Sequence, residues 1–152
     1  MIQTRRTYRS DELEEFVIDS EVRKAKLYKD NKKIQVYNVP AAFDIETSSF
    51  YEGKQKRACM YIWMLGLNGL VMTGRTWEEF REVCDGLSDL LGLGSGRQLY
   101  IYVHNLEFEF QWIRHRFEWA KVFATGPRTP AYALTTTGIC FRCSYILSGY
   151  SL

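Results

Sequence analysis

Histidine is nearly absent from this sequence, and its scarcity excludes several kinds of site. The chain has only two histidines, His104 and His115, which argues against a metal site built on imidazole ligands. Neither a serine nucleophile elbow nor a Walker phosphate-loop pattern occurs. The glycines of GLGSGR, residues 92–97, follow a predicted helix and precede a strand, the reverse of a phosphate loop, so they predict a turn.

A disulfide framework is also missing. The four cysteines, Cys59, Cys84, Cys140 and Cys143, lack the dense spacing of a secreted scaffold, so a reducing cytoplasm is expected. Cys140 and Cys143 form a C-x-x-C pair without a second pair at zinc spacing, and on a strand they would point to opposite faces. We expect both to pack in the core as small hydrophobic side chains.

Long apolar runs and a strong net charge are lacking as well. No segment approaches the roughly 18 apolar residues of a membrane span, and the N-terminus turns acidic where a signal peptide needs an apolar stretch. We therefore expect a soluble protein with no membrane partner. The net charge of +2 does not by itself call for a polyanionic partner. With 152 residues, 46% of them hydrophobic, the chain suffices for one domain with its own core.

The sequence pattern changes near residue 39. Residues 1–38 are charge-rich, and we expect a peripheral arm, a short helix or extended segment leading into a surface hairpin or strand. The rest, 39–152, alternates strands and helices and predicts an α/β fold, a mixed sheet with flanking helices. Its expected elements are a strand at 39–47, a hairpin of 57–67 and 70–74 turning at Asn68-Gly69, a helix capped by Thr76 and Glu79, a strand at 98–105, a helix at 106–117, a strand at 119–126, and two strands around Thr137-Gly138.

Two acids interrupt the first of these strands. Asp44 and Glu46 in FDIET are two positions apart, so on a strand they face the same side. If both carboxylates were buried without a partner, the fold would lose several kcal/mol of stability. Binding of Mg²⁺ or Mn²⁺ would offset that loss, because these ions take oxygen ligands. The alternative is an exposed strand end with both acids solvated. The pattern alone is weak, because DSE at Asp19 to Glu21 repeats it in a polar segment.

A second polar group follows the apolar strand at 98–105. His104-Asn105 stands at a strand-to-helix junction, where α/β sheets usually present functional side chains. Asn105 is alternatively an ordinary helix N-cap. Glu109 lies one helical turn after Asn105 and is spaced to face the same cleft, or else it is a solvated acid on an amphipathic helix.

The stretches around Asp44 and around Asn105 together resemble motifs of a known protein family. FDIETSSF at 43–50 and YVHNLEFEFQWIR at 102–114 resemble, in order and spacing, the first two exonuclease motifs of the protein-primed family B DNA polymerases of bacteriophages and related elements. The tail FRCSYILSGYSL, residues 141–152, is similar to the segment preceding their last exonuclease motif. The resemblance spans Phe43 to Leu152 and leaves the first forty residues uncovered.

The resemblance implies a ribonuclease-H-like fold and a 3′-to-5′ exonuclease that proofreads by hydrolysing a mismatched nucleotide at the 3′ end of single-stranded DNA. It assigns catalysis, and Mg²⁺ or Mn²⁺ binding in a two-metal site, to Asp44, Glu46 and Glu109. Glu109 stands where many relatives carry Asp. The implied DNA contacts fall on Thr47, Asn105 and Phe108. His104 and Ser144 match supporting or DNA-contacting positions.

In the family, a last motif with a final metal-binding Asp would lie beyond Leu152, and 152 residues leave no room for the polymerase palm, fingers and thumb. We therefore expect an exonuclease-like domain that is incomplete at its C-terminus, a fragment or truncated product of a phage-type polymerase. Its nuclease activity alone is expected to be weak or absent. The expected location is the cytoplasm of a bacterial host, with a phage or mobile element as the source.

Two other hypotheses stay open. The first is that the chain is a stand-alone, polymerase-derived protein that acts as a non-catalytic binding or inhibitory module against a protein partner. The second is that the chain is a nuclease whose metal site is completed by a partner chain or by a second copy in a dimer.

Overall fold

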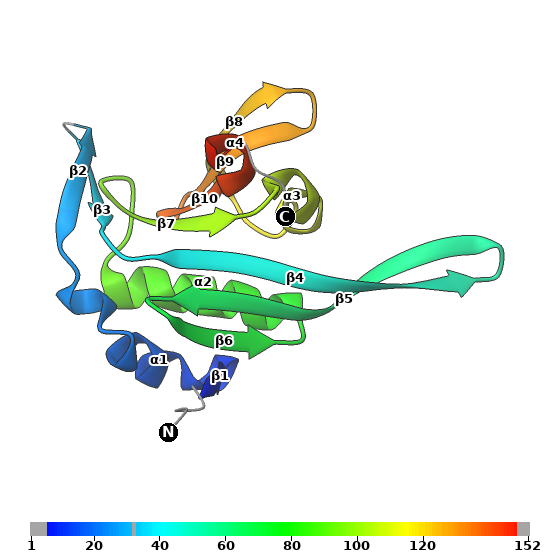
Figure 1. Cartoon of the computed structure of the whole chain (residues 1–152), viewed down its shortest axis with the longest axis horizontal. Helices are drawn as coiled ribbons and strands as arrows, with labels where there is room; N and C mark the ends of the chain where they lie inside the picture. Colours follow the sequence, from blue (N-terminus) through cyan, green and yellow to red (C-terminus); the bar gives the residue numbers. More distant parts are fainter. Residues whose placement is uncertain (1–5, 32, 149–152) are drawn as a thin grey trace.

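The computed structural model describes residues 6–31 and 33–148 (Figure 1). Ten strands form one sheet in the order β1-β6-β5-β4-β7-β10-β9-β8, and the β2–β3 hairpin joins it through pairing of β3 with β7. The strands are β1 (Thr7–Arg9), β2 (Leu27–Asn31), β3 (Ile34–Tyr37), β4 (Ala41–Glu52), β5 (Gln55–Leu67), β6 (Leu70–Gly74), β7 (Arg97–Val103), β8 (Trp119–Gly126), β9 (Thr129–Thr135) and β10 (Ile139–Cys143). The helices are α1 (Leu13–Asp19), α2 (Trp77–Leu91), α3 (Leu106–Ile113) and α4 (Ser144–Ser148), with 3₁₀ turns at Ser10–Glu12 and Val22–Lys24.

The sheet is mixed. β4, β7 and β10 run parallel to one another, while β5 is antiparallel to both β4 and β6, and β9 is antiparallel to both β8 and β10. The prediction of a mixed α/β sheet with flanking helices is therefore confirmed. The hairpin at Asn68-Gly69 is confirmed too, because both residues have positive φ, as the predicted tight turn requires. The predicted helix at 106–117 is shorter and ends at Ile113.

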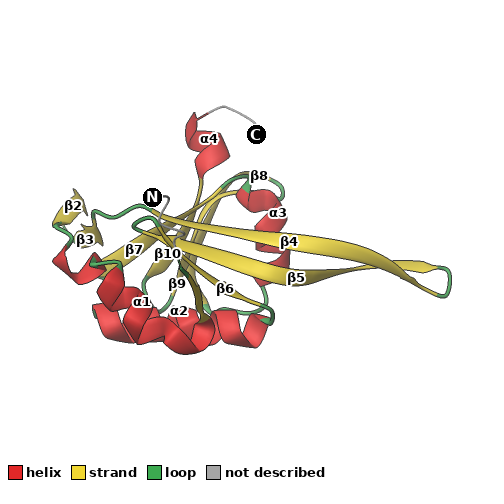
Figure 2. Ribbon diagram, turned by 60° about the horizontal axis from the view of Figure 1, so that its bottom comes forward, coloured by secondary structure: helices red, strands yellow, loops and turns green. Residues whose placement is uncertain are grey.

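The main core lies where α2 covers one face of the sheet (Figure 2). Phe80 of α2 is fully buried and stacks on Phe43 of β4 with 4.4 Å between ring centroids. A smaller cluster of Val36, Tyr100 and Cys140 is buried apart from it. Cys143 belongs to the main core, so the prediction that the C-x-x-C cysteines pack on opposite faces is confirmed.

The N-terminal segment differs from the peripheral arm that its charges predict. Tyr8, Phe16, Val17 and Val22 are buried in the main core, and β1 pairs with β6. Most apolar residues in the described part of this segment are buried or half-buried, with Ile18 and Tyr28 as exposed exceptions, while its many charged residues stay at the surface. The expected short helix and hairpin are present as α1 and the β2–β3 pair. The expected peripheral position is wrong, because four inward-facing side chains suffice to join the segment to the core.

A long two-stranded arm is the feature that the sequence pattern did not predict. The strand expected at 39–47 continues to Glu52, and β5 already starts at Gln55, so the two strands stay paired far beyond the body of the molecule (Figure 1). Gly53, with φ of 64°, forms the turn between them. Residues 48–59 are all exposed, and we call them the arm.

Helix α2 begins with the predicted capping box. Thr76 Oγ1 accepts a hydrogen bond from Glu79 N at 3.2 Å, and Glu79 Oε2 accepts one from Thr76 N at 3.4 Å. We expect Thr76→Ala to lower the free energy of unfolding by about 1 kcal/mol in urea denaturation, since both bonds depend on this turn. Thr136→Ala, at an exposed threonine, is the control. Equal effects of the two substitutions would contradict a specific role of the cap.

Candidate functional site

The carboxyl ends of three parallel strands meet at one edge of the sheet. Ala42 of β4 pairs with Tyr102 of β7, and Val103 of β7 pairs with Cys143 of β10. Asp44 and His104 each lie two residues beyond the first of these pairs, and Ser144 directly follows the second. The register therefore brings three of the predicted site residues to the same edge, although they are far apart in sequence.

Glu109 reaches this edge on α3. Asn105 adopts a left-handed conformation with φ of 59°, which turns the chain sharply from β7 into the helix. Leu106 and Ile113 are fully buried, and Glu109 lies between them on the same helical face. Its residue exposure is only 4%, so the alternative of a solvated acid is wrong. Asn105 does occupy the N-cap position of α3, as the alternative predicted, but its side chain makes no capping hydrogen bond.

Asp44 and Glu109 form a carboxyl pair. The pKa of Glu109 is raised to about 7, mainly by burial and to a smaller extent by the neighbouring Asp44 carboxylate. Glu109 Oε2 is buried without any hydrogen-bond partner. Asp44 and Glu46 are both exposed, so the alternative of an exposed strand end is the one that the structure bears out for these two acids. Asp44 Oδ1 accepts a hydrogen bond from Ile45 N at 2.9 Å. A buried carboxylate oxygen without a partner is costly, and a proton or a cation shared with Asp44 would reduce that cost.

Carboxylate oxygens are ligands that Mg²⁺ and Mn²⁺ prefer, so the chemistry of this pair fits a hard divalent cation. Glu46 lies on the same face of β4, about 7 Å further along the strand, and is exposed. Within residues 6–31 and 33–148, no three His, Cys, Asp or Glu side chains lie close enough together to hold a metal ion. Two of the three predicted acids thus meet, and the third stands apart.

The predicted DNA-contacting residues fall into two groups. His104 Nδ1 lies 3.3 Å from Ser144 Oγ, and its ring meets Tyr145 edge-on, so His104 and Ser144 support each other. Thr47 is half-buried on β4 next to Glu46. The tail of the third matching stretch, residues 149–152, lies outside the described residues.

The second group surrounds an open hollow beside α3. Asn105 and Phe108 line it with Glu107, Gln111 and Arg128, and the Phe108 residue is 45% exposed. Arg128 was not predicted, because it comes from the β8–β9 turn and nothing in its local sequence shows that it faces α3. The hollow therefore combines an exposed aromatic ring with an arginine, beside the helix that carries the buried acid.

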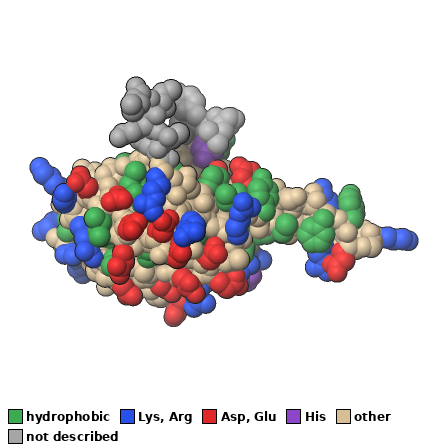
Figure 3. All heavy atoms as spheres, turned by 90° about the horizontal axis from the view of Figure 1, so that it is seen from below, with side chains coloured by type: hydrophobic (Ala, Val, Ile, Leu, Met, Phe, Trp, Pro, Cys, Tyr) green, Lys and Arg blue, Asp and Glu red, His purple; other side chains and the backbone are tan. Residues whose placement is uncertain are grey.

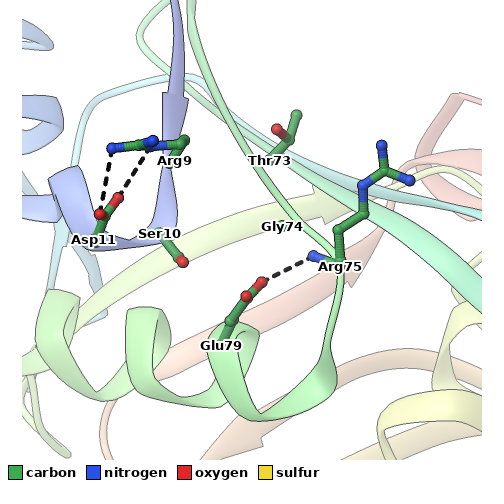
Figure 4. A pocket seen from close by; sticks show the side chains of 7 residues that line it. All are labelled: Arg9, Ser10, Asp11, Thr73, Gly74, Arg75 and Glu79. Atoms are coloured by element: carbon green, nitrogen blue, oxygen red, sulfur yellow. Dashed lines mark hydrogen bonds and ion pairs between the residues drawn. The ribbon is translucent and has the colours of Figure 1, made fainter.

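Another hollow lies between β1 and the start of α2 (Figure 4). Its carboxylates are already engaged: Asp11 pairs with Arg9 at 3.3 Å, and Glu79 accepts a hydrogen bond from Arg75 N at 2.8 Å. These contacts fix the 3₁₀ turn and the start of the helix. The hollow thus offers no free acid comparable to Glu109.

No family model matches the sequence, and no curated protein or solved structure is significantly similar to it. In the described part of the chain, none of the helices is both long and apolar enough to cross a membrane.

Proposed function

We propose that this chain carries the metal-binding acids of a 3′-to-5′ exonuclease like those of phage-type family B DNA polymerases, on a ribonuclease-H-like sheet. The observation that carries the proposal is the buried, unpartnered Glu109 Oε2 beside Asp44. The position of β4 at the centre of the sheet, between antiparallel β5 and parallel β7, supports the fold assignment. The substrate would be the 3′ end of single-stranded DNA.

Each residue has a distinct role in this proposal. Asp44 and Glu109 would hold Mg²⁺ or Mn²⁺, and Glu46 would join them only by moving closer, to make the two-metal site. A metal ion bound there would neutralise phosphate charge and activate water. Phe108 is exposed and placed to stack on a base, a contact that tolerates any sequence. Since only two acids meet, we infer weak hydrolysis by this chain alone.

Metal binding tests the proposal directly. We expect Mn²⁺ to bind at pH 8 and Asp44→Asn to weaken its affinity at least 10-fold, about 1.4 kcal/mol, because one of two ligand carboxylates is lost. Isothermal titration calorimetry measures both constants. Asp85→Asn, an exposed aspartate on α2, makes the same chemical change away from the site and should leave the affinity unaltered.

Equal Mn²⁺ affinities of the wild type and Asp44→Asn would reject the metal site. Rapid Mn²⁺-dependent degradation of a single-stranded oligonucleotide, abolished by Asp44→Ala, would instead show that weak activity is the wrong expectation.

The separation of Glu46 from the other acids favours a second candidate function. The chain would then be a polymerase-derived binding or inhibitory protein that retains the carboxyl pair without hydrolysing DNA. Mn²⁺ binding together with no detectable nuclease activity, even at high protein concentration, would favour this function. Activity that rises with the square of protein concentration would favour a site completed by a second copy.

A further inference from the structure

The net positive charge of this protein is concentrated in the arm. Residues 48–59 contain three basic residues, Lys54, Lys56 and Arg57, and one acid, Glu52. The rest of the chain has 17 basic and 17 acidic residues, so the arm accounts for the whole net charge of +2. Arg57 pairs with Glu52 at 2.8 Å, whereas the side chains of the two lysines make no hydrogen bond or ion pair within the described residues.

The arm also exposes two large aromatic rings. Phe50 is 49% exposed and Tyr51 is 72% exposed. On the two-stranded ladder, Phe50 lies opposite Arg57, and Tyr51 lies opposite Lys56. Each face of the arm therefore presents one aromatic ring next to one cation. Figure 3 shows hydrophobic and basic side chains along the arm, while acids and bases are mixed over the body.

The arm is continuous with the candidate site. The register shift near Glu46 places one extra residue, Tyr61, in β5, so the side chains of β4 keep alternating without interruption. Phe50 therefore lies on the face of β4 that carries Asp44 and Glu46. Phe50 lies six positions beyond Asp44, a distance of about 20 Å along the strand, which several nucleotides would span.

We propose that the arm is a binding site for single-stranded nucleic acid, in which Phe50 and Tyr51 stack on bases and Lys54, Lys56 and Arg57 contact phosphates. Interleaved aromatic rings and cations are the chemistry that binds single strands without sequence preference. The excess positive charge complements a polyanion. This site does not depend on the metal site of the proposed function, because its contacts need no metal.

The test is binding of a fluorescein-labelled 20-mer oligothymidylate to the full chain in EDTA, followed by anisotropy. We expect Lys54→Gln/Lys56→Gln to weaken binding about 10-fold at 0.1 M salt and to reduce the slope of log affinity against log salt by about 1.4, two phosphate contacts. Phe50→Thr/Tyr51→Thr should weaken binding at least 10-fold with little change in that slope.

The matched control is Lys26→Gln/Lys29→Gln, which removes the same charge from exposed positions near β2. An equal loss of affinity in this control and in the arm lysine variant would overturn the proposal, because general charge would then explain the binding. Unchanged affinity in both arm variants would overturn it as well. Because the substituted arm residues are exposed, the arm variants should unfold at the same temperature as the wild type. This measurement separates a loss of binding from a loss of folding.

Further outcomes identify the ligand. Oligouridylate and oligothymidylate compared side by side assign the site to RNA, to DNA or to both, and each result supports a single-strand site. Equal affinity for a 20-base-pair duplex would overturn it, since paired bases cannot stack on the rings.

Sedimentation tests self-association of the arm. If the wild type is a dimer that Phe50→Thr/Tyr51→Thr dissociates, and oligonucleotide affinity is unchanged, the arm serves self-association instead. Failure of Mn²⁺ binding alone would reject the metal site and leave the arm proposal standing.

Discussion

Replacing Phe80 by alanine is expected to lower the free energy of unfolding by about 3 to 5 kcal/mol. The Phe80 ring is fully buried and lies within 6.3 Å of the ring centroids of Phe43, Trp63, Trp77, Phe117 and Phe141. Alanine would leave a cavity that five rings held by different elements cannot close together. The loss therefore includes both the transfer of the ring and the cavity.

Urea denaturation measures this effect. Phe50→Ala removes the same side chain from an exposed position of the arm and should change stability by less than about 0.5 kcal/mol. A cost below about 1 kcal/mol for Phe80→Ala would mean that the core repacks freely. Because Phe43 stacks on Phe80 and directly precedes Asp44, the same substitution should also loosen the position of that acid.

Glu109→Gln is expected to stabilise the metal-free protein at pH 8 by about 2 kcal/mol. The pKa of Glu109 is about 7 in the folded chain against an ordinary 4.5. Between these values the unfolded chain gives up the proton while the folded chain keeps it, so wild-type stability falls as pH rises from 4.5 to 7. The full pKa difference corresponds to about 3 kcal/mol, and water on the open side near Asp44 reduces it.

Glutamine cannot ionise, and its amide is able to donate a hydrogen bond to Asp44. The stability difference between Glu109→Gln and the wild type should therefore grow between pH 4.5 and pH 7 and stay constant above it, when measured by urea denaturation in EDTA. Glu107→Gln, at an exposed position of the same helix, should show no such growth. A difference that is independent of pH would contradict a raised pKa at Glu109.

Local signals in the sequence predicted the parts of the fold that local contacts determine. The capping residues Thr76 and Glu79 and the spacing of apolar residues predicted α2, and Asn68-Gly69 predicted the β5–β6 turn. The arm could not be predicted this way, because residues 48–59 bury neither face and so carry no alternating pattern.

The site was predictable only in part, for a related reason. The spacing identified Asp44 and Glu109 as candidates, but whether Glu109 is buried depends on how α3 is rotated about its axis. Leu106 and Ile113 fix that rotation by packing in the core. Glu46 is exposed on β4, so burial does not single it out as it does Glu109. Arg128 reaches the hollow through the β8–β9 turn, a tertiary contact that no local pattern encodes.

The parallel pairing of β4, β7 and β10 has a consequence for folding kinetics. The hairpins β5–β6 and β8–β9 close short loops and are able to form early, whereas the parallel pairs join segments that are distant along the chain. An intermediate that contains only the hairpins would therefore lack the edge where Asp44, His104 and Ser144 align. The acids would come together late, so a cation bound by Asp44 and Glu109 would report completion of the native sheet rather than local structure.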